Sequence, residues 1–196
     1  MLAKATAFIL VTVILIDQII EHFIIYSPSH WIFSRLRCNY YLKKLKSGSG
    51  KFFSCYGLWI WYPQNVCIGN NVYFNRNVLI GGVPDPDSSI YIGENCLFGP
   101  NVIIVSGEHN YDHPTLSTRD AGVLVGPIII EKNCWIGGNV TITKGVKIGE
   151  GSVIGANSVI TKDIPPYSLA AGCPAKILKQ LTKDKRQIDL NNKSIY

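Results

Sequence analysis

Two histidines, His109 and His113, stand four positions apart in a polar stretch, S-G-E-H-N-Y-D-H-P, which begins at Ser106. They are the only histidines after position 30. An imidazole titrates near neutral pH, so a histidine in such a stretch can take a proton from a reacting hydroxyl group. The alternative is an ordinary histidine in a surface loop, and the residues alone leave both readings open.

A second candidate group is the pair Gly137 and Gly138, which follows Trp135 in W-I-G-G-N-V. Glycine leaves its backbone N–H unobstructed, and such donors can stabilise the oxyanion that forms during acyl transfer. The alternative is that the two glycines only shape a tight corner. The sequence therefore indicates a donor for an oxyanion here without deciding the role.

The six cysteines suggest no further chemistry. No pair forms C-x-x-C, so neither a zinc knuckle nor a thioredoxin-type pair is indicated. None lies in the histidine stretch, so a cysteine nucleophile is not indicated either. We expect reduced, mostly buried thiols in a cytosolic protein.

The element that must position these groups is a six-residue repeat. Large apolar residues recur every six positions on two registers, and only position 86 is missing from the first: Ile68, Phe74, Ile80, Ile92, Phe98 and Ile104, then Ile130, Ile136, Ile142, Ile148, Ile154 and Ile160. Three positions after each comes a corner position that usually holds Asn or Gly: Asn71, Asn77, Val83, Asn95, Asn101, Gly107, Asn133, Asn139, Gly145, Gly151, Asn157 and Asp163. Four positions after stand small or β-branched residues, as at Val72 and Ser158.

A period of six fits no α-helix but fits a short strand followed by a tight corner. Asn, Gly and Asp tolerate the left-handed backbone geometry that such corners need. Three units would close a triangular coil of about 18 residues, and stacked coils would pair strand to strand. The sequence therefore predicts an all-β solenoid; chance clustering of β-branched residues in a β-sandwich is the alternative.

The repeat is interrupted twice. About 20 extra residues leave the coil near Ser106 and return near Pro127, and a shorter segment, V-P-D-P-D-S-S, fills the missing slot. A long loop in a regular solenoid is more often functional than structural. The two interruptions lie one coil apart, so we expect them to project from nearby corners and to build one pocket.

Composition and charge bound the remaining possibilities. The chain has 196 residues, 47% apolar and only 16% charged, which excludes disorder of the whole chain. The net charge of +6 is unevenly spread: residues 31–51 carry six Lys or Arg and no acid, residues 176–196 carry six basic and two acidic groups, and the middle is mildly acidic. A nucleic-acid reader with a basic working face does not fit this distribution.

The N-terminal segment is apolar from Ala5 to Ile16, but Asp17, Gln18, Glu21 and His22 interrupt the apolar character between there and Tyr26. It is neither a clean transmembrane helix, which needs roughly 20 apolar residues, nor a signal peptide with a small-residue cleavage site. Two readings remain: a helix in or on a membrane, with the basic residues of 31–51 at anionic head groups, or a helix packed on a partner subunit.

These patterns predict four segments. Residues 1–30 form an apolar N-terminal helix with possible membrane association, and residues 31–64 form a basic connecting segment. Residues 65–165 form the solenoid with a protruding loop at 106–127. Residues 166–196 form a basic C-terminal segment, where the spacing of Ile177, Leu178 and Leu181 predicts a short helix that covers one open end of the coils.

The longer motifs carry a family resemblance over about residues 65–180. F-G-P-N-V-I-I-V-S-G-E-H-N-Y-D-H-P, W-I-G-G-N-V and T-K-D-I-P-P-Y-S-L-A-A-G-C-P-A-K resemble the maltose/galactoside O-acetyltransferase group of hexapeptide-repeat acyltransferases and its relatives in polysaccharide biosynthesis. The resemblance implies a left-handed parallel β-helix. It also implies direct acetyl transfer from acetyl-CoA to a sugar hydroxyl, with His109 as the general base and no metal. His113 would hold the loop.

The same resemblance implies the other site residues and partners. Asn75, Asp87 and Asp112 would serve the acceptor, and Asp112 or Glu108 could orient His109. The expected acetyl-CoA site consists of Trp135, Gly138, Ala156, Thr161, Lys162 and Lys176. The family usually forms homotrimers in which two subunits share each groove. The acceptor would be a sugar or glycan, there would be no nucleic-acid partner, and the enzyme would be cytoplasmic, either free or held at the cytoplasmic face of the membrane.

Three other functions are alternatives. N-acetylation of an amino sugar uses the same machinery. The γ-class carbonic anhydrase shares the fold but needs three histidine ligands for zinc, and only His109 and His113 follow position 30. A non-catalytic solenoid scaffold would differ from the acetyltransferases by failing to bind acetyl-CoA.

Overall fold

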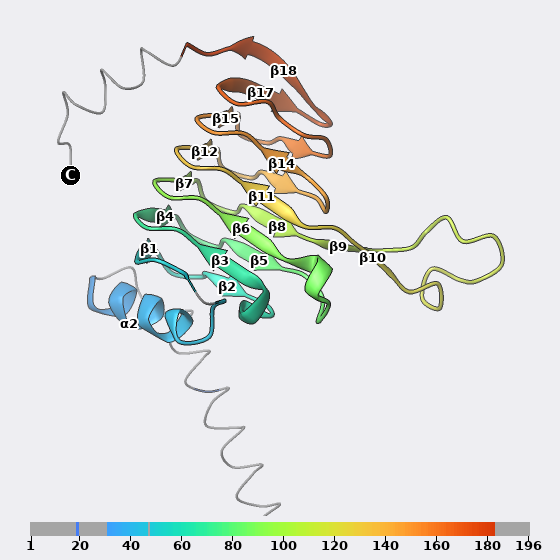
Figure 1. Ribbon diagram of the computed structural model, residues 1–196, viewed down its shortest axis with the longest axis horizontal. Helices are drawn as coiled ribbons and strands as arrows, with labels where there is room; N and C mark the ends of the chain where they lie inside the picture. Colours follow the sequence, from blue (N-terminus) through green and yellow to red (C-terminus); the bar gives the residue numbers. More distant parts are fainter. Residues whose placement is uncertain (1–18, 20–30, 47, 183–196) are drawn as a thin grey trace, which may run out of the picture.

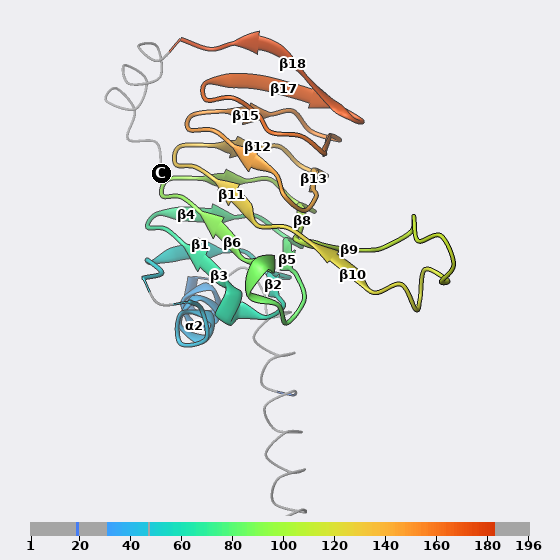
Figure 2. The ribbon, with the colours of Figure 1, turned by 45° about the vertical axis from the view of Figure 1, so that its right-hand side comes forward.

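The computed structural model describes residue 19 and residues 31–46 and 48–182. The chain winds into a stack of parallel coils with three sheets, one on each side of a triangular section, as Figure 1 and Figure 2 show. We name them sheets A, B and C in the order in which the chain visits them. The predicted all-β solenoid is therefore confirmed.

Each sheet is built from short strands of successive coils. In spatial order, sheet A contains β1 (Phe52–Ser54), β4 (Val72–Phe74), β7 (Leu97–Phe98), β12 (Trp135–Ile136), β15 (Val153–Ile154), β17 (Ser168–Gly172) and β18 (Ala175–Gln180). Sheet B contains β2 (Trp59–Ile60), β5 (Leu79–Gly81), β8 (Ile103–Val105), β13 (Thr141–Ile142) and β16 (Val159–Ile160). Sheet C contains β3 (Val66–Ile68), β6 (Ile90–Ile92), β11 (Ile128–Ile130) and β14 (Lys147–Ile148).

The large apolar residues of the repeat all point into the stack. Ile68, Ile80 and Ile104 are 0% exposed, and the rest of the grid is equally buried. The rings of Phe74 and Phe98 stack on neighbouring coils with centroids 4.9 Å apart. The register explains the stacking, because each strand pairs with the residue one coil away that holds the same place in the repeat, as Phe74 does with Phe98.

The corners use the predicted left-handed geometry. Asn71, Asn77, Asn95, Asn101, Asn133, Asn139 and Asn157 have φ between 55° and 62°, and Gly145 and Gly151 also have positive φ. At the corner between sheets A and B, the asparagines form a ladder in which each Nδ2 donates to the Oδ1 of the next residue, over 3.2, 2.9 and 3.1 Å from Asn77 to Asn157. Val83, Gly107 and Asp163 lack positive φ, and they lie where loops or the last coil break the repeat.

A helix covers the N-terminal end of the stack in the segment that the sequence predicts only as a connection. Helix α2 (Trp31–Leu42) lies beside β1 (Figure 1), and Cys38 and Tyr41 join the buried core. Arg37 is 0% exposed, and its Nε donates to Ser54 Oγ over 3.2 Å. Burial lowers the pKa of this guanidinium. Strands β1 and β2 then add a coil below the first repeat unit recognised in the sequence.

The short C-terminal helix is wrong at residues 175–180, which form β18. This strand pairs antiparallel with β17, with Gly172 opposite Ala175 and Ser168 opposite Gln180. The free edge of β17 needs partners for its backbone N–H and C=O groups, and this requirement overrides a weak helical spacing. Figure 1 shows β18 at the end of the stack opposite α2.

The predicted helix at 1–30 lies outside the described residues, apart from residue 19. Among the residues that the structure describes, none of the helices is long and apolar enough to cross a membrane.

Candidate active site

The histidine stretch forms a hairpin that stands away from the coils. After β8 the chain passes Ser106 and enters β9 (Gly107–His109), which pairs antiparallel with β10 (Val123–Val125). His109 lies opposite Val123 at the end of β9, and its side chain is exposed. Figure 1 and Figure 2 show the hairpin and its loop projecting sideways from the stack.

The base of this hairpin is tied to the next coil. Glu108 Oε1 lies 3.2 Å from Lys144 Nζ, and the Gly126 N–H donates to the Ser106 carbonyl over 3.0 Å. Because Glu108 precedes His109 directly, this ion pair ties the strand that carries His109 to the corner at Lys144.

His113 closes the first turn of the loop. Its Nδ1 accepts hydrogen bonds from the backbone N–H groups of Thr115 (3.3 Å) and Leu116 (3.0 Å). A ring nitrogen that accepts carries no proton, so this geometry supports the predicted role of His113 in holding the loop. Asp112 is exposed two residues after Asn110, whose Oδ1 accepts from the Asp112 N–H.

The two interruptions of the repeat meet, as the sequence predicts. The segment 82–89 contains a short 3-10 helix, η2 (Pro86–Ser88), and Ser106 Oγ donates to the Ser88 carbonyl. Ser88 Oγ in turn donates to the carbonyl of Val83 over 2.7 Å. Asp87 is exposed on η2. Both interruptions therefore leave the stack at the corner between sheets B and C, on adjacent coils.

Most of the remaining predicted site residues lie at two corners of the stack. Thr161 and Lys162 follow β16 at the corner between sheets B and C, on a different coil from His109, and both side chains are exposed. At the corner between sheets A and B lie Asn75, Gly138 and Ala156, and Trp135 stands 54% exposed on the outer face of sheet A. Lys176 is exposed on β18. One chain therefore carries His109 and Gly138 on different corners, with sheet B between them.

The backbone N–H groups of the two glycines proposed as oxyanion donors differ in their hydrogen bonding. The Gly137 N–H already donates to the Ile154 carbonyl over 2.8 Å, so its use as an oxyanion donor is wrong. The Gly138 N–H has no acceptor among the described residues. Asn75, one coil below Gly99, uses its Oδ1 to accept from the Arg76 N–H over 2.8 Å.

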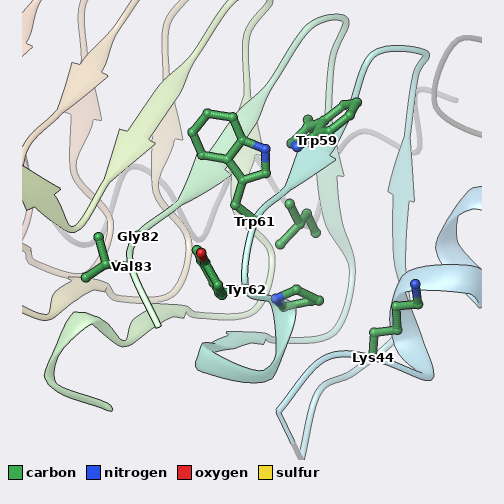
Figure 3. Close-up of a pocket in the computed structure, with 8 residues that line it drawn as sticks. Lys44, Trp59, Trp61, Tyr62, Gly82 and Val83 are labelled. Atoms are coloured by element: carbon green, nitrogen blue, oxygen red, sulfur yellow. The ribbon is translucent and has the colours of Figure 1, made fainter. Parts of the chain in front are cut away.

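Sequence reasoning missed one cavity, of about 520 Å³, which Figure 3 shows. It is lined by Lys44, Trp59, Ile60, Trp61, Tyr62, Pro63, Gly82 and Val83. The sequence signal was present in W-I-W-Y, because alternation in a strand puts Trp59 and Trp61 on one face. The W-I-W-Y segment precedes Ile68, the first residue of the six-residue repeat, so the repeat did not include it. In the described part of the chain, no three His, Cys, Asp or Glu side chains gather as a metal site would require.

Known proteins are similar to this chain in sequence and in architecture. A family model described as the hexapeptide repeat of succinyl-transferase matches residues 89–107 and 127–162. The galactoside O-acetyltransferase of Escherichia coli (strain K12) is 41% identical over 126 residues, which are 63% of this chain and 59% of that protein. The chain thus spans less than two thirds of the length of this curated relative.

Two solved structures extend the comparison. A hexapeptide-repeat containing acetyltransferase from Vibrio cholerae, complexed with acetyl coenzyme A, has a TM-score of 0.63 and 32% identity, covering 76% of this chain and 78% of that one. A maltose O-acetyltransferase from Clostridium difficile 630 has a TM-score of 0.65 and 34% identity, covering 76% of both chains. The coil stack, its asparagine corners and these relatives together show that the chain belongs to the hexapeptide-repeat acetyltransferases, so its coil is a left-handed β-helix.

Proposed function

We propose that this protein is an acetyl-CoA-dependent O-acetyltransferase that acetylates a sugar hydroxyl of a glycan or polysaccharide precursor. The observation that carries the proposal is the exposed imidazole of His109 on a hairpin whose base is fixed by Glu108 and Lys144. The similarity to galactoside and maltose O-acetyltransferases, and to a neighbour complexed with acetyl coenzyme A, supports the choice of substrates.

In the proposed reaction His109 takes the proton from the acceptor hydroxyl as its oxygen attacks the thioester carbonyl. A bond forms between this oxygen and the acetyl carbon, and the carbonyl oxygen becomes an oxyanion. The free N–H of Gly138 is the candidate donor to this oxyanion. The carbon–sulfur bond then breaks, and His109 returns the proton to the departing thiolate, so the imidazole ends as it began.

The two corners suggest how the site is completed. His109 and Gly138 lie on opposite sides of sheet B. Within one chain, therefore, the imidazole of His109 does not face the N–H of Gly138. We propose a homotrimer in which the His109 hairpin of one subunit meets the Gly138 corner of its neighbour. Trp135, Ala156, Thr161, Lys162 and Lys176 would then line the acetyl-CoA groove. Lys162 and Lys176 are exposed and could meet its phosphates.

For the acceptor we propose contacts from Asn75, Asp87 and Asp112. Asp87 and Asp112 lie on the two interruptions that meet at Ser106 and Ser88, which supports a shared pocket there. Asn75 would come from the Gly138 corner of the neighbouring subunit. Its amide nitrogen could donate to a ligand, and its oxygen, which accepts one hydrogen bond from the Arg76 N–H, has a second lone pair for another donor.

We propose a cytoplasmic protein whose N-terminal segment contacts the membrane surface. Support comes from the apolar residues 5–16 and from the exposed Arg35, Lys43 and Lys46 that come after them. Cell fractionation of the full chain and of a chain without residues 1–30 tests this idea. If both stay in the soluble fraction, the membrane contact is refuted.

Product mass spectrometry tests the activity itself. The full chain is incubated with acetyl-CoA and a panel of sugars, nucleotide sugars and glycolipid precursors, and products that carry an acetyl group in place of one hydroxyl hydrogen are expected. His109→Asn should lower kcat by a factor of roughly 10²–10⁴, because general-base catalysis contributes about that much, while acetyl-CoA still binds.

His113→Asn is the matched control, because it lies in the same loop and an asparagine Oδ1 can still accept the hydrogen bonds from Thr115 and Leu116. Its kcat should stay within a few-fold of wild type. A near wild-type kcat for His109→Asn would refute the assignment of the base. A protein that neither transfers acetyl groups nor binds acetyl-CoA would be a scaffold.

A further inference from the structure

The cavity of Figure 3 lies at the corner between sheets B and C, on the coil below the two interruptions. Trp59 and Trp61 project from β2 and the residue after it, and Tyr62 precedes the short 3-10 helix η1 (Pro63–Asn65). In Figure 3 the aromatic side chains lie between Val83 at one end and Lys44 at the other. The cavity is thus an aromatic-lined hollow that runs from α2 toward the histidine hairpin.

This hollow adjoins the proposed reaction site. Val83 lines it, and the side chain of Val83 lies within 3.4 Å of the position that a Cβ on Gly107 would occupy. Gly107 begins β9, which ends at His109. The Asn65 amide fixes the same corner by donating to the Asp85 carbonyl over 2.9 Å. A molecule in the hollow would therefore lie directly beside the base of the hairpin that carries His109.

The backbone at Tyr62 favours a smaller residue. Tyr62 has φ 50° and ψ 57°, the left-handed region that most corners of this chain fill with Asn or Gly; Tyr167, with φ 54°, is the other tyrosine in this region. A residue with a Cβ is strained in this region, whereas a glycine is not. Its side chain is 39% exposed, so core packing does not account for it.

Trp61 also depends on a special arrangement. Its side chain packs against Gly81, where an added Cβ would lie 3.0 Å from Trp61 Cε3. The indole is nevertheless 48% exposed. Because position 81 has no side chain, the Trp61 ring can pack against this strand and still present about half of its surface to solvent.

The chemistry of the lining selects the ligand. Two indoles and a phenol offer flat, weakly polar faces, and among the lining residues that the structure describes, Lys44 is the only charged one. Lys44 is held by Tyr40, whose ring centroid lies 4.2 Å from its Nζ. A pyranose fits such a site, because its C–H face can stack on an aromatic plate while its hydroxyls reach a donor at the rim. A nucleotide diphosphate would need more than one cation.

We propose that this hollow is a subsite for a second pyranose ring of the acceptor, so that the preferred acceptor is a saccharide of two or more rings. The inference rests on the proposed acetyl transfer for its direction, because the first ring must present its hydroxyl at His109. Trp61 would carry the stacking, with Trp59 and Tyr62 as walls and Lys44 as the hydrogen-bond donor.

The test compares sugars that differ by one ring. The full chain is assayed with glucose, maltose and maltotriose, with galactose and lactose, and with N-acetylglucosamine and its β-1,4 dimer. Binding is followed separately by the quenching of tryptophan fluorescence without acetyl-CoA. For at least one pair, the longer sugar should bind and react at least tenfold better, as kcat/KM, than its single ring.

Trp61→Ala should bring this ratio close to one, and Trp61→Phe should restore part of it because a phenyl ring still stacks. Tyr91→Ala is the control. Tyr91 is 49% exposed on sheet C, away from the hollow, and its loss should leave the ratio unchanged.

Each failure has a separate meaning. If acetyl transfer occurs but no pair shows a preference for the longer sugar, the subsite is refuted and the proposed function stands. If no sugar is acetylated, the proposed function fails, and fluorescence still decides whether the longer sugar binds. If Trp61→Ala instead dissociates the oligomer in sedimentation velocity, the hollow is a subunit contact and the inference is overturned.

Discussion

The substitution Gly99→Ala tests whether the spacing between neighbouring coils controls the acetyl-CoA site. A Cβ added at Gly99 would lie 2.5 Å from the Gly138 nitrogen and 2.8 Å from the Gly137 carbonyl carbon. Both atoms are backbone, so they cannot rotate away, and the two coils must move apart. Gly99 has no positive φ, so the backbone conformation itself accepts alanine.

The expected cost reflects two opposing effects. Overpacking of this kind costs about 1–3 kcal/mol. Replacing glycine by alanine recovers roughly 0.5 kcal/mol, because it restricts the unfolded chain. Gly99→Ala should therefore lower the free energy of unfolding by about 0.5–2.5 kcal/mol, and 1.5 kcal/mol would lower the Tm by roughly 3–6 °C in a chain of this size.

Gly93→Ala is the matched control. A Cβ there would lie 2.5 Å from the Lys132 nitrogen, the same clash at the corner between sheets C and A, where no predicted site residue lies. Differential scanning calorimetry should show a similar loss of Tm for both variants. Calorimetric titration should show acetyl-CoA binding weakened at least fivefold only in Gly99→Ala. Equal acetyl-CoA affinities of the two variants would refute the role of the Gly138 corner.

Two further predictions concern the coil stack. Asn101→Ala removes two ladder hydrogen bonds and puts alanine at φ 57°, so urea unfolding should show a loss of about 2–4 kcal/mol, against about 1–2 for Asn101→Gly; equal losses would contradict the left-handed corner. The Lys147 ammonium lowers the pKa of Glu131 below its ordinary 4.5, so their pairing stabilises the fold above that pH and is lost as pH falls below it. The small Tm difference between wild type and Glu131→Gln should therefore be present at pH 7 and vanish toward pH 3, and a difference that grows on acidification would contradict the pairing.

The coil itself could be predicted from local sequence, because its rules are local. Large apolar residues such as Ile104 recur at every sixth position, because each face of the coil buries one large side chain. Asn101 recurs because each corner needs a left-handed residue. Both interruptions were visible as breaks in the period, and their adjacency followed from the number of residues per coil.

The two ends of the stack were not predictable in this way. At the C-terminal end, β17 presents a strand edge, and Ala175–Gln180 forms a strand to pair with it despite a helical spacing of apolar residues. At the N-terminal end, Arg37 belongs by sequence to a basic cluster, yet it is fully buried against Ser54. Such outcomes depend on which groups another part of the chain leaves unpaired.

For the candidate site, too, some features follow from the local sequence and others from the fold. The sequence by itself determined the types of residue available, including His109 in a loop and Gly138 at a corner, because motif and period are properties of neighbouring residues. Only the tertiary structure decided that the Gly137 N–H donates to the Ile154 carbonyl and that His109 and Gly138 lie on different corners. It also decided that Trp59, Trp61 and Tyr62 line one hollow together with Val83. These contacts join residues of different coils, and stacking brings such residues together only when the chain has folded.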